Sequence, residues 1–254
     1  MSNPKVHLFI DNSNIFISAK DEAQQREGRP AKNQVRIHFE HLLELAVVGR
    51  NLGKVCVVGS IPPEQQAVWD RLEQATGVKP ELFERGQFTG GEQGLDQCLQ
   101  VHMLRAISDH PEPQIVVLMT GDGAGYDTGV GFHADMERMF DAGWGVEVIR
   151  WRGHCRRALR EWAERHGVFV SLDDHYHSVT FLESVRYATR LDLSKRALAK
   201  ARLGPARAAE EKARLESEAK IASLEKKLKD IETAAAEKAA AKAKHERRFS
   251  RGKQ

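Results

Sequence analysis

The chain has 254 residues, of which 41% are hydrophobic, and this is enough to bury the core of one α/β domain with an appendage. It contains no run of 18 apolar residues, so we expect no transmembrane helix and no membrane partner. Its three cysteines are far apart and include no Cys-x-x-Cys pair, which argues against a disulfide framework or a zinc finger. The N-terminus lacks the pattern of a secretory signal, and together these features favour a cytoplasmic protein.

The net charge of +3 conceals an uneven distribution along the chain. Residues 179–254 hold 20 Lys/Arg against 11 Asp/Glu, whereas residues 1–178 hold 19 against 25. The composition therefore predicts an acidic globular part and a basic tail. The sign of the tail suits a polyanionic partner such as nucleic acid.

Short apolar runs typical of strands alternate with segments of helical periodicity. We expect strands at 5–10, 54–60, 80–83, 114–119, 145–151 and 168–172, and helices at 39–48, 65–76, 94–108, 135–142 and 156–165. The alternation predicts βαβ units, and therefore an α/β fold with a mainly parallel sheet and helices on both faces. In such sheets the functional crevice lies beyond the carboxyl ends of the strands.

The composition also suggests how the chain is divided. We expect a globular domain at 1–178, a helical linker at 179–204, a long basic helix at 205–246 and a disordered tail at 247–254. Within the basic helix, apolar residues follow heptad spacing for two heptads, at Ile221, Leu224, Leu228, Ile231 and Ala235. Two heptads are fewer than a coiled coil normally needs, so the helix is either solvated or pairs with a second copy or a partner helix.

Two acidic residues follow predicted strands directly. Asp11 ends the run LFID, and Asp122 ends IVVLMTGD. Each residue alone also suits a turn or a helix N-cap. Two carboxylates at neighbouring strand ends, however, repel each other unless a cation lies between them, and Mg²⁺ prefers such oxygen ligands.

Two further acids belong to the same predicted crevice. Asp96 lies in the first turn of a helix, where the helix dipole alone favours a carboxylate. Asp127 lies in the segment 121–131, whose five glycines allow the chain to fold a carboxylate back over the site. The alternative for Asp127 is a solvated loop residue.

The ordered blocks LFIDNSNI, GLDQCLQVHML, VVLMTGD and GVEVIRW resemble NYN domains of the PIN-like nuclease superfamily over roughly residues 5–175. The resemblance implies a PIN-like, Rossmann-like three-layer sandwich, here with a C-terminal helical extension. It also implies a metal-dependent endonuclease that hydrolyses phosphodiester bonds, in RNA rather than DNA, with Mg²⁺ or Mn²⁺ as cofactor. It assigns metal binding and catalysis to Asp11, Asp96 and Asp122, and we expect Asn14 and Thr120 to support them by hydrogen bonds.

One block departs from the family pattern. Many NYN domains continue the third block as GD-x-D-F, whereas here Phe132 takes the phenylalanine position and Gly131 the position of the acid. The inserted segment GAGYDTGV carries Asp127, which we expect to serve as the fourth metal-binding and catalytic residue. The alternative is a non-catalytic nucleic-acid-binding or adaptor protein that keeps the NYN fold. The absence of a GxxxxGK[ST] motif argues against a nucleotide-handling enzyme.

Basic and aromatic residues lie in and around the strand at 145–151. Guanidinium groups suit phosphate, so we expect nucleic-acid contacts from four arginines close to His154, namely Arg150, Arg152, Arg156 and Arg157. The alternative is that these arginines form a solvated surface patch. Trp144 and Trp151 either stack on bases or pack in the core. We interpret the histidines of the segment 173–177, DDHYH, as residues of a surface loop rather than metal ligands.

Overall fold

The computed structural model describes residues 3–61, 66–84, 94–121 and 129–202, together with 209, 212–224, 226–227 and 229. The chain divides into two compact units, Met1–Gly204 and Pro205–Gln254. Among the described residues, no helix is both long and apolar enough to cross a membrane.

The first unit is built on a six-stranded parallel sheet with the order β4-β3-β1-β5-β6-β7. The strands are β1 (Val6–Asp11), β3 (Leu52–Ile61), β4 (Glu81–Glu84), β5 (Ile115–Met119), β6 (Gly145–Arg150) and β7 (Val168–Ser171). The chain enters at the centre, winds outward to β4, and then winds outward in the other direction from β5. This arrangement confirms the predicted α/β fold with a mainly parallel sheet.

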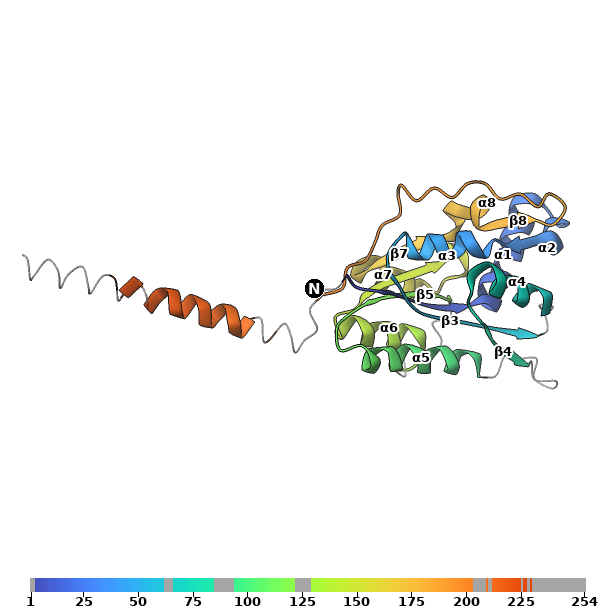
Figure 1. Ribbon diagram of the computed structural model, residues 1–254. Helices are drawn as coiled ribbons and strands as arrows, with labels where there is room; N and C mark the ends of the chain where they lie inside the picture. The colour runs from blue at the N-terminus through green and yellow to red at the C-terminus, as the bar shows by residue number, and fades with distance from the viewer. Residues whose placement is uncertain are drawn as a thin grey trace, which may run out of the picture. The chain divides into compact units, whose positions relative to one another are not determined.

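Helices cover both faces of the sheet and complete a three-layer sandwich (Figure 1). One face carries α1 (Asn12–Glu27), α3 (Phe39–Val47), α4 (Gln66–Thr76) and α8 (Tyr176–Val179), and the other carries α5 (Leu95–Asp109), α6 (Gly131–Asp141) and α7 (Arg157–His166). Side chains of β1 alternate between the two cores, with Leu8 and Ile10 in one and Phe9 in the other. This period of two explains why the strands are continuous apolar runs.

Several elements have no clear signal in the sequence. The buried residues of α1 include Asn12, Ser13, Ser18 and Ala19, so this helix lacks the apolar periodicity that marks an amphipathic helix. A short helix, α2 (Ala31–Gln34), follows it. The three-residue strands β2 (Val35–Ile37) and β8 (Thr180–Leu182) pair antiparallel in a small second sheet. Three residues are too few for a strand period to be recognised.

The helical linker predicted at 179–204 is wrong. Residues 180–182 form β8, and residues 183–202 contain no helix. This segment returns to the sheet because Arg196 pairs with the buried carboxylate of Glu147 on β6, and Leu191 packs in the core. The globular unit consequently extends well beyond the predicted boundary at residue 178.

The described residues of the second unit between 209 and 229 are helical. Ile221 and Leu224, the first two heptad positions, are exposed. The heptad positions Leu228, Ile231 and Ala235, as well as the predicted disordered tail at 247–254, lie outside the described residues. Pairing through this helix therefore stays a prediction.

Candidate active site

The first and third sequence blocks meet at the centre of the sheet. β1 pairs with β3 on one side and with β5 on the other, so the strand order reverses between β1 and β5. Asp11 is the last residue of β1, and Thr120 and Gly121 follow β5 directly. The two strand ends are neighbours, and Asp11 lies where doubly wound sheets commonly bind their ligands.

Asp11 is only 4% exposed and is held through both carboxylate oxygens. Its Oδ1 accepts a hydrogen bond from the backbone N–H of Asn14 at 2.9 Å, and its Oδ2 accepts one from the Thr120 hydroxyl at 3.3 Å. The first bond is an N-cap at the start of α1, so Asp11 is the helix cap that the alternative interpretation predicts and also lies at the candidate site. Together the two bonds fix the orientation of the carboxylate.

The segment that follows β5 is fixed from the same side. The side-chain oxygen of Asn14 accepts a hydrogen bond from the N–H of Gly121 at 3.4 Å. A Cβ atom at Gly121 would lie 2.3 Å from the carbonyl oxygen of His154 and 2.5 Å from Nε of Arg150, so no larger residue fits there. The hydrogen bonds of Asn14 and Thr120 thus orient the Asp11 carboxylate and the segment after β5, as supporting residues would do. Their supporting roles in metal binding stay predictions.

Arg150 is an internal residue, and its predicted place on a phosphate-binding surface is wrong. It is 2% exposed and donates hydrogen bonds to the carbonyl oxygen of Asn14 and to the Ser18 hydroxyl, each at 2.7 Å. Burial lowers the pKa of Arg150 to about 10, and the charge of Asp11 opposes that shift. Arg150 ends β6 beneath α1, where it compensates the charge of Asp11 and holds the first turn of α1.

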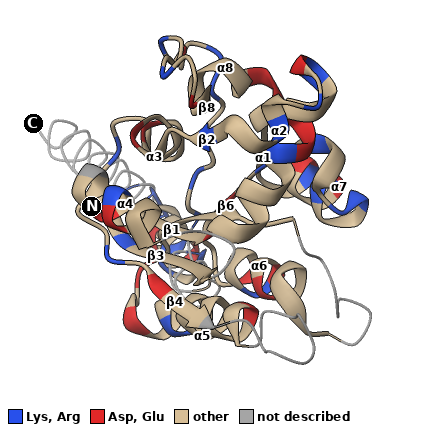
Figure 2. Cartoon of the chain, turned by 90° about the vertical axis from the view of Figure 1, so that its right-hand side faces the viewer, with Lys and Arg blue, Asp and Glu red and all other residues tan. Residues whose placement is uncertain are grey.

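The other predicted basic residues are exposed, and two of them form ion pairs. Arg152 lies 3.4 Å from Glu164, and Arg157 lies 2.6 Å from Glu161. Arg156 is exposed as well. Charged residues of both signs lie along α1, α2 and α7 at this end of the molecule (Figure 2), so nucleic-acid contacts by Arg152, Arg156 and Arg157 stay a prediction.

Both tryptophans pack in the core, the second of the two alternatives predicted for them. Trp144 and Trp151 are 1% and 0% exposed, and Nε1 of Trp151 donates a hydrogen bond to the carbonyl oxygen of Ile15. The segment 173–177, predicted to be a surface loop, is helical instead, since Leu172–His175 form a 3-10 turn and α8 begins at the buried Tyr176. Asp173 accepts hydrogen bonds from the backbone N–H of Arg152 and from the Ser171 hydroxyl. Asp173 therefore ties this 3-10 turn to the ends of β6 and β7.

Asp96 lies in the first turn of α5, after Gly94, and is partly exposed. Because α5 connects parallel strands, it begins at the carboxyl edge of the sheet, the edge where Asp11 lies. α5 also packs against β1 and β3. Asp122 and Asp127 lie outside the described residues, so the structure places two of the four predicted acids.

The backbone conformation at residue 131 suits glycine rather than the acid of the family pattern. Gly131 begins α6 with a φ of 88°, a conformation that disfavours residues with a side chain. Phe132 is 1% exposed and packs in the core shared by α5, α6 and α7. Phe132 thus anchors the start of α6, and an aspartate in place of Gly131 would be strained. The substitution of Asp127 for that acid stays a prediction.

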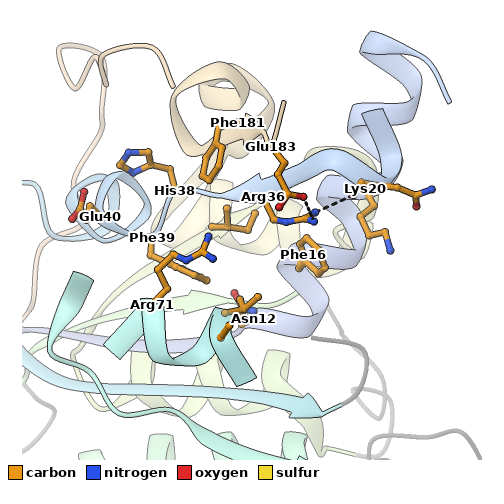
Figure 3. A pocket seen from close by; sticks show the side chains of 14 residues that line it. Asn12, Phe16, Lys20, Arg36, His38, Phe39, Glu40, Arg71, Phe181 and Glu183 are labelled. Carbon is orange, nitrogen blue, oxygen red and sulfur yellow. Dashed lines mark hydrogen bonds and ion pairs between the residues drawn. The ribbon is translucent and has the colours of Figure 1, made fainter. Parts of the chain in front are cut away.

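A cavity of about 440 Å³ opens on the face of the sheet that carries α1, α3 and α4 (Figure 3). Asn12, the residue after Asp11, contributes to its wall. Aromatic and cationic side chains line it, namely Phe16, Phe39, Phe181, Lys20, Arg36 and Arg71. Arg36 is paired with Glu183 at 2.5 Å, whereas Arg71 is exposed and forms no ion pair within the described ranges. Sequence reasoning missed this cavity because several separate segments form it.

A second group of ligand-type side chains lies between β3, β4 and α5. One ligand atom each from Cys56, Glu81, Cys98 and His102 lies within 4.8 Å of the others. The carboxylate of Glu81 is 3.1 Å from Sγ of Cys98 and 2.8 Å from Nε2 of His102. The wide spacing of the cysteines concealed this group. The pair Cys98 and His102, four residues apart on one helix, is the signal that could have revealed it.

The mostly parallel sheet with helices on both faces is an α/β three-layer fold consistent with PIN-like proteins. The sequence matches the NYN domain family over residues 5–172, and the chain belongs to this family. NYN domains are in general nucleases that use divalent metals and act on nucleic acid. A crystal structure of a protein of unknown function from Vibrio parahaemolyticus is similar, with a TM-score of 0.48 and 15% identity, over 68% of this chain and 94% of that chain. No curated protein matches the sequence.

Proposed function

We propose that the protein is an endonuclease that hydrolyses phosphodiester bonds with the help of Mg²⁺ or Mn²⁺, in RNA rather than DNA. The observation that carries this proposal is the buried carboxylate of Asp11 at the reversal of strand order, oriented by Asn14 and Thr120. Carboxylate, hydroxyl and amide oxygens converge there, and this set suits a hard divalent cation. Asp11, Asp96, Asp122 and Asp127 would hold the ion.

Such an ion, when bound, neutralises charge on the phosphate and lowers the pKa of water. The chain itself contributes positioning. Thr120 and Asn14 hold the carboxylate of Asp11 in one orientation, and the positive charge of the buried Arg150 guanidinium interacts favourably with that carboxylate. Asp127, on the glycine-rich segment, would complete the acid set in place of the residue lost at Gly131.

The cavity beside Asn12 suits a single-stranded substrate. Bases stack on aromatic side chains, which Phe16, Phe39 and Phe181 would provide, and the guanidinium of Arg71, which forms no ion pair with any residue that the structure describes, suits phosphate. A nucleic-acid strand bound in this cavity would lie against Asn12, the residue that follows Asp11 in the sequence. We therefore propose that the cavity binds nucleotides next to the bond that is cleaved.

The proposal is tested with labelled single-stranded RNA and DNA of the same sequence, incubated with metal-free protein and then with added Mg²⁺ or Mn²⁺. We expect internal cleavage of the RNA only after the metal is added, and slower cleavage of the DNA. An Asp11→Asn variant purified in parallel reports contaminating ribonuclease. Binding of RNA without cleavage in the presence of either metal would instead identify a non-catalytic adaptor, the alternative that the loss of the acid at Gly131 suggests.

Replacing Arg71 with alanine is expected to weaken RNA binding and leave the single-turnover rate at saturating RNA unchanged, because Arg71 contacts phosphate away from the reacting bond. The slope of the logarithm of the binding constant against the logarithm of the salt concentration should fall by about 0.7, the value for one phosphate contact on a single strand. Arg105→Ala, an exposed arginine on α5, is the matched control. Equal slopes in the two variants would show that the cavity does not bind the strand.

Deleting residues 205–254 is expected to leave a folded nuclease unit, because Met1–Gly204 forms a compact unit of its own. The deletion removes 14 Lys/Arg and 9 Asp/Glu, so RNA affinity and its salt dependence should both decrease. Filter binding at several salt concentrations measures both quantities. An unchanged salt slope would indicate that this segment serves only to pair with a second copy or a partner helix.

A further inference from the structure

We propose that Cys56, Glu81, Cys98 and His102 bind a zinc ion, at a site with different donor chemistry from the carboxylate site around Asp11. The four residues come from three elements at one side of the sheet, with Cys56 on β3, Glu81 on β4, and Cys98 and His102 on α5. The two sites belong to different classes, since this group offers sulfur and imidazole nitrogen, which zinc prefers and Mg²⁺ does not.

The geometry of the group fits four-coordinate zinc. One donor atom from each residue lies within 4.8 Å of the others, so a small contraction brings two sulfurs, one nitrogen and one carboxylate oxygen around a single ion. Cys98 and His102 are four residues apart and lie on the same face of α5. Cys56 is buried, whereas Glu81 is exposed, so the site has an inner wall and an opening to solvent through which an ion can enter.

The charges around the group would nearly balance a bound zinc ion. Two thiolates and a carboxylate would leave a zinc site with one formal negative charge, and Lys54, whose Nζ lies 2.7 Å from Nδ1 of His102, is placed to offset it. Without the ion, burial raises the pKa of Cys56 to about 12 and that of Cys98 to about 11, and the charge of Glu81 acts in the same direction. The thiols are therefore protonated in the metal-free protein, and zinc has to displace both protons.

The position of the group indicates a structural role for the ion. Zinc bound there would tie the edge strand β4 to β3 and to the beginning of α5. Asp96 lies two residues before Cys98 in that first part of α5. The ion would thus stabilise the part of the chain that positions Asp96, without itself taking part in hydrolysis.

The test uses the reduced full-length chain without a metal-binding tag, and measures zinc by mass spectrometry after dialysis. We expect one zinc ion per chain in the wild type, and loss of that ion in Cys56→Ser, Cys98→Ser and His102→Gln. Cys155→Ser is the matched control, because Cys155 is the third cysteine and lies outside the group. Substitution by Co²⁺ should produce a thiolate-to-cobalt charge-transfer absorption in the wild type and in Cys155→Ser alone.

The spectrum of the Co²⁺-loaded wild type keeps the test decisive even where a variant fails to fold, because it reports thiolate ligation directly. Absence of both bound zinc and the charge-transfer band in the wild type would overturn the proposal, as would zinc retained by Cys98→Ser or a disulfide between Cys56 and Cys98. Nucleic acid is not needed for these measurements. A negative result therefore leaves the proposed nuclease function standing, and loss of the nuclease proposal leaves the zinc site standing.

Discussion

Replacing Asp11 with asparagine is expected to lower the single-turnover rate of RNA cleavage by at least about 10²-fold, the contribution typical of a positioned catalytic group. Asparagine has nearly the same shape and can still accept the N-cap hydrogen bond from Asn14, so α1 should still form. What is lost is the negative charge that a divalent ion needs. Rates measured at saturating Mg²⁺ and at saturating Mn²⁺ report the effect.

Sequence reasoning alone predicts that neutralising one of several crowded acids relieves repulsion and leaves stability equal or higher. The structure changes this expectation, because the buried guanidinium of Arg150 is compensated by Asp11. We now expect Asp11→Asn to melt at a lower temperature than the wild type while remaining folded by circular dichroism. Asp109→Asn, an exposed aspartate at the far end of α5, is the control for both measurements. A wild-type cleavage rate in Asp11→Asn would remove the proposed site.

Replacing Glu147 with alanine is expected to reduce the free energy of unfolding by about 3–5 kcal/mol, the cost of breaking a buried ion pair on one side. Glu147 is fully buried on β6 and pairs with Arg50 at 2.7 Å and with Arg196. It also accepts a hydrogen bond from the backbone N–H of Ala199 at 2.8 Å. The substitution leaves Arg196, itself buried, without its carboxylate, and releases the segment 183–202 from the sheet.

Urea denaturation of Glu147→Ala and of the wild type measures this loss. Glu164→Ala is the matched control, since Glu164 forms an exposed ion pair with Arg152 at 3.4 Å. Such surface pairs contribute less than about 1 kcal/mol. A loss of the same small size in both variants would show that residues 183–202 are not held through Glu147.

The sheet could be predicted from the sequence because its strands are buried on both faces. Runs such as Ile115–Met119 are apolar at every position, and the glycines and prolines between runs mark the turns. α1 could not be predicted in this way, since its buried side includes small and polar residues such as Ser13 and Ser18. The composition of residues 179–204 resembles that of a helix, yet the segment 183–202 contains none. Its actual path is set by Glu147, far away in the sequence.

The candidate site was predictable to the extent that it follows strand ends. Asp11 and Thr120 come directly after strands, and the parallel topology brings them together. The surface position predicted for Arg150 is wrong because α1 covers this strand end and accepts the hydrogen bonds of the guanidinium, and the sequence around Arg150 carries no signal of that cover. The group around Cys56 and Glu81 was missed because its members are spread over 47 residues and are joined only by the pairing of β3 with β4 and the packing of α5.

The central claim is that Asp11 helps to hold the divalent ion that the proposed reaction uses. The most direct measurement is the binding of Mn²⁺, followed by loss of the electron paramagnetic resonance signal of free Mn²⁺, in wild type, Asp11→Asn and Asp109→Asn. We predict tight binding by the wild type and by Asp109→Asn, and at least about 10-fold weaker binding by Asp11→Asn, because even residues that only support metal ligands contribute about 10–100-fold. Equal Mn²⁺ affinity in all three proteins would contradict the account.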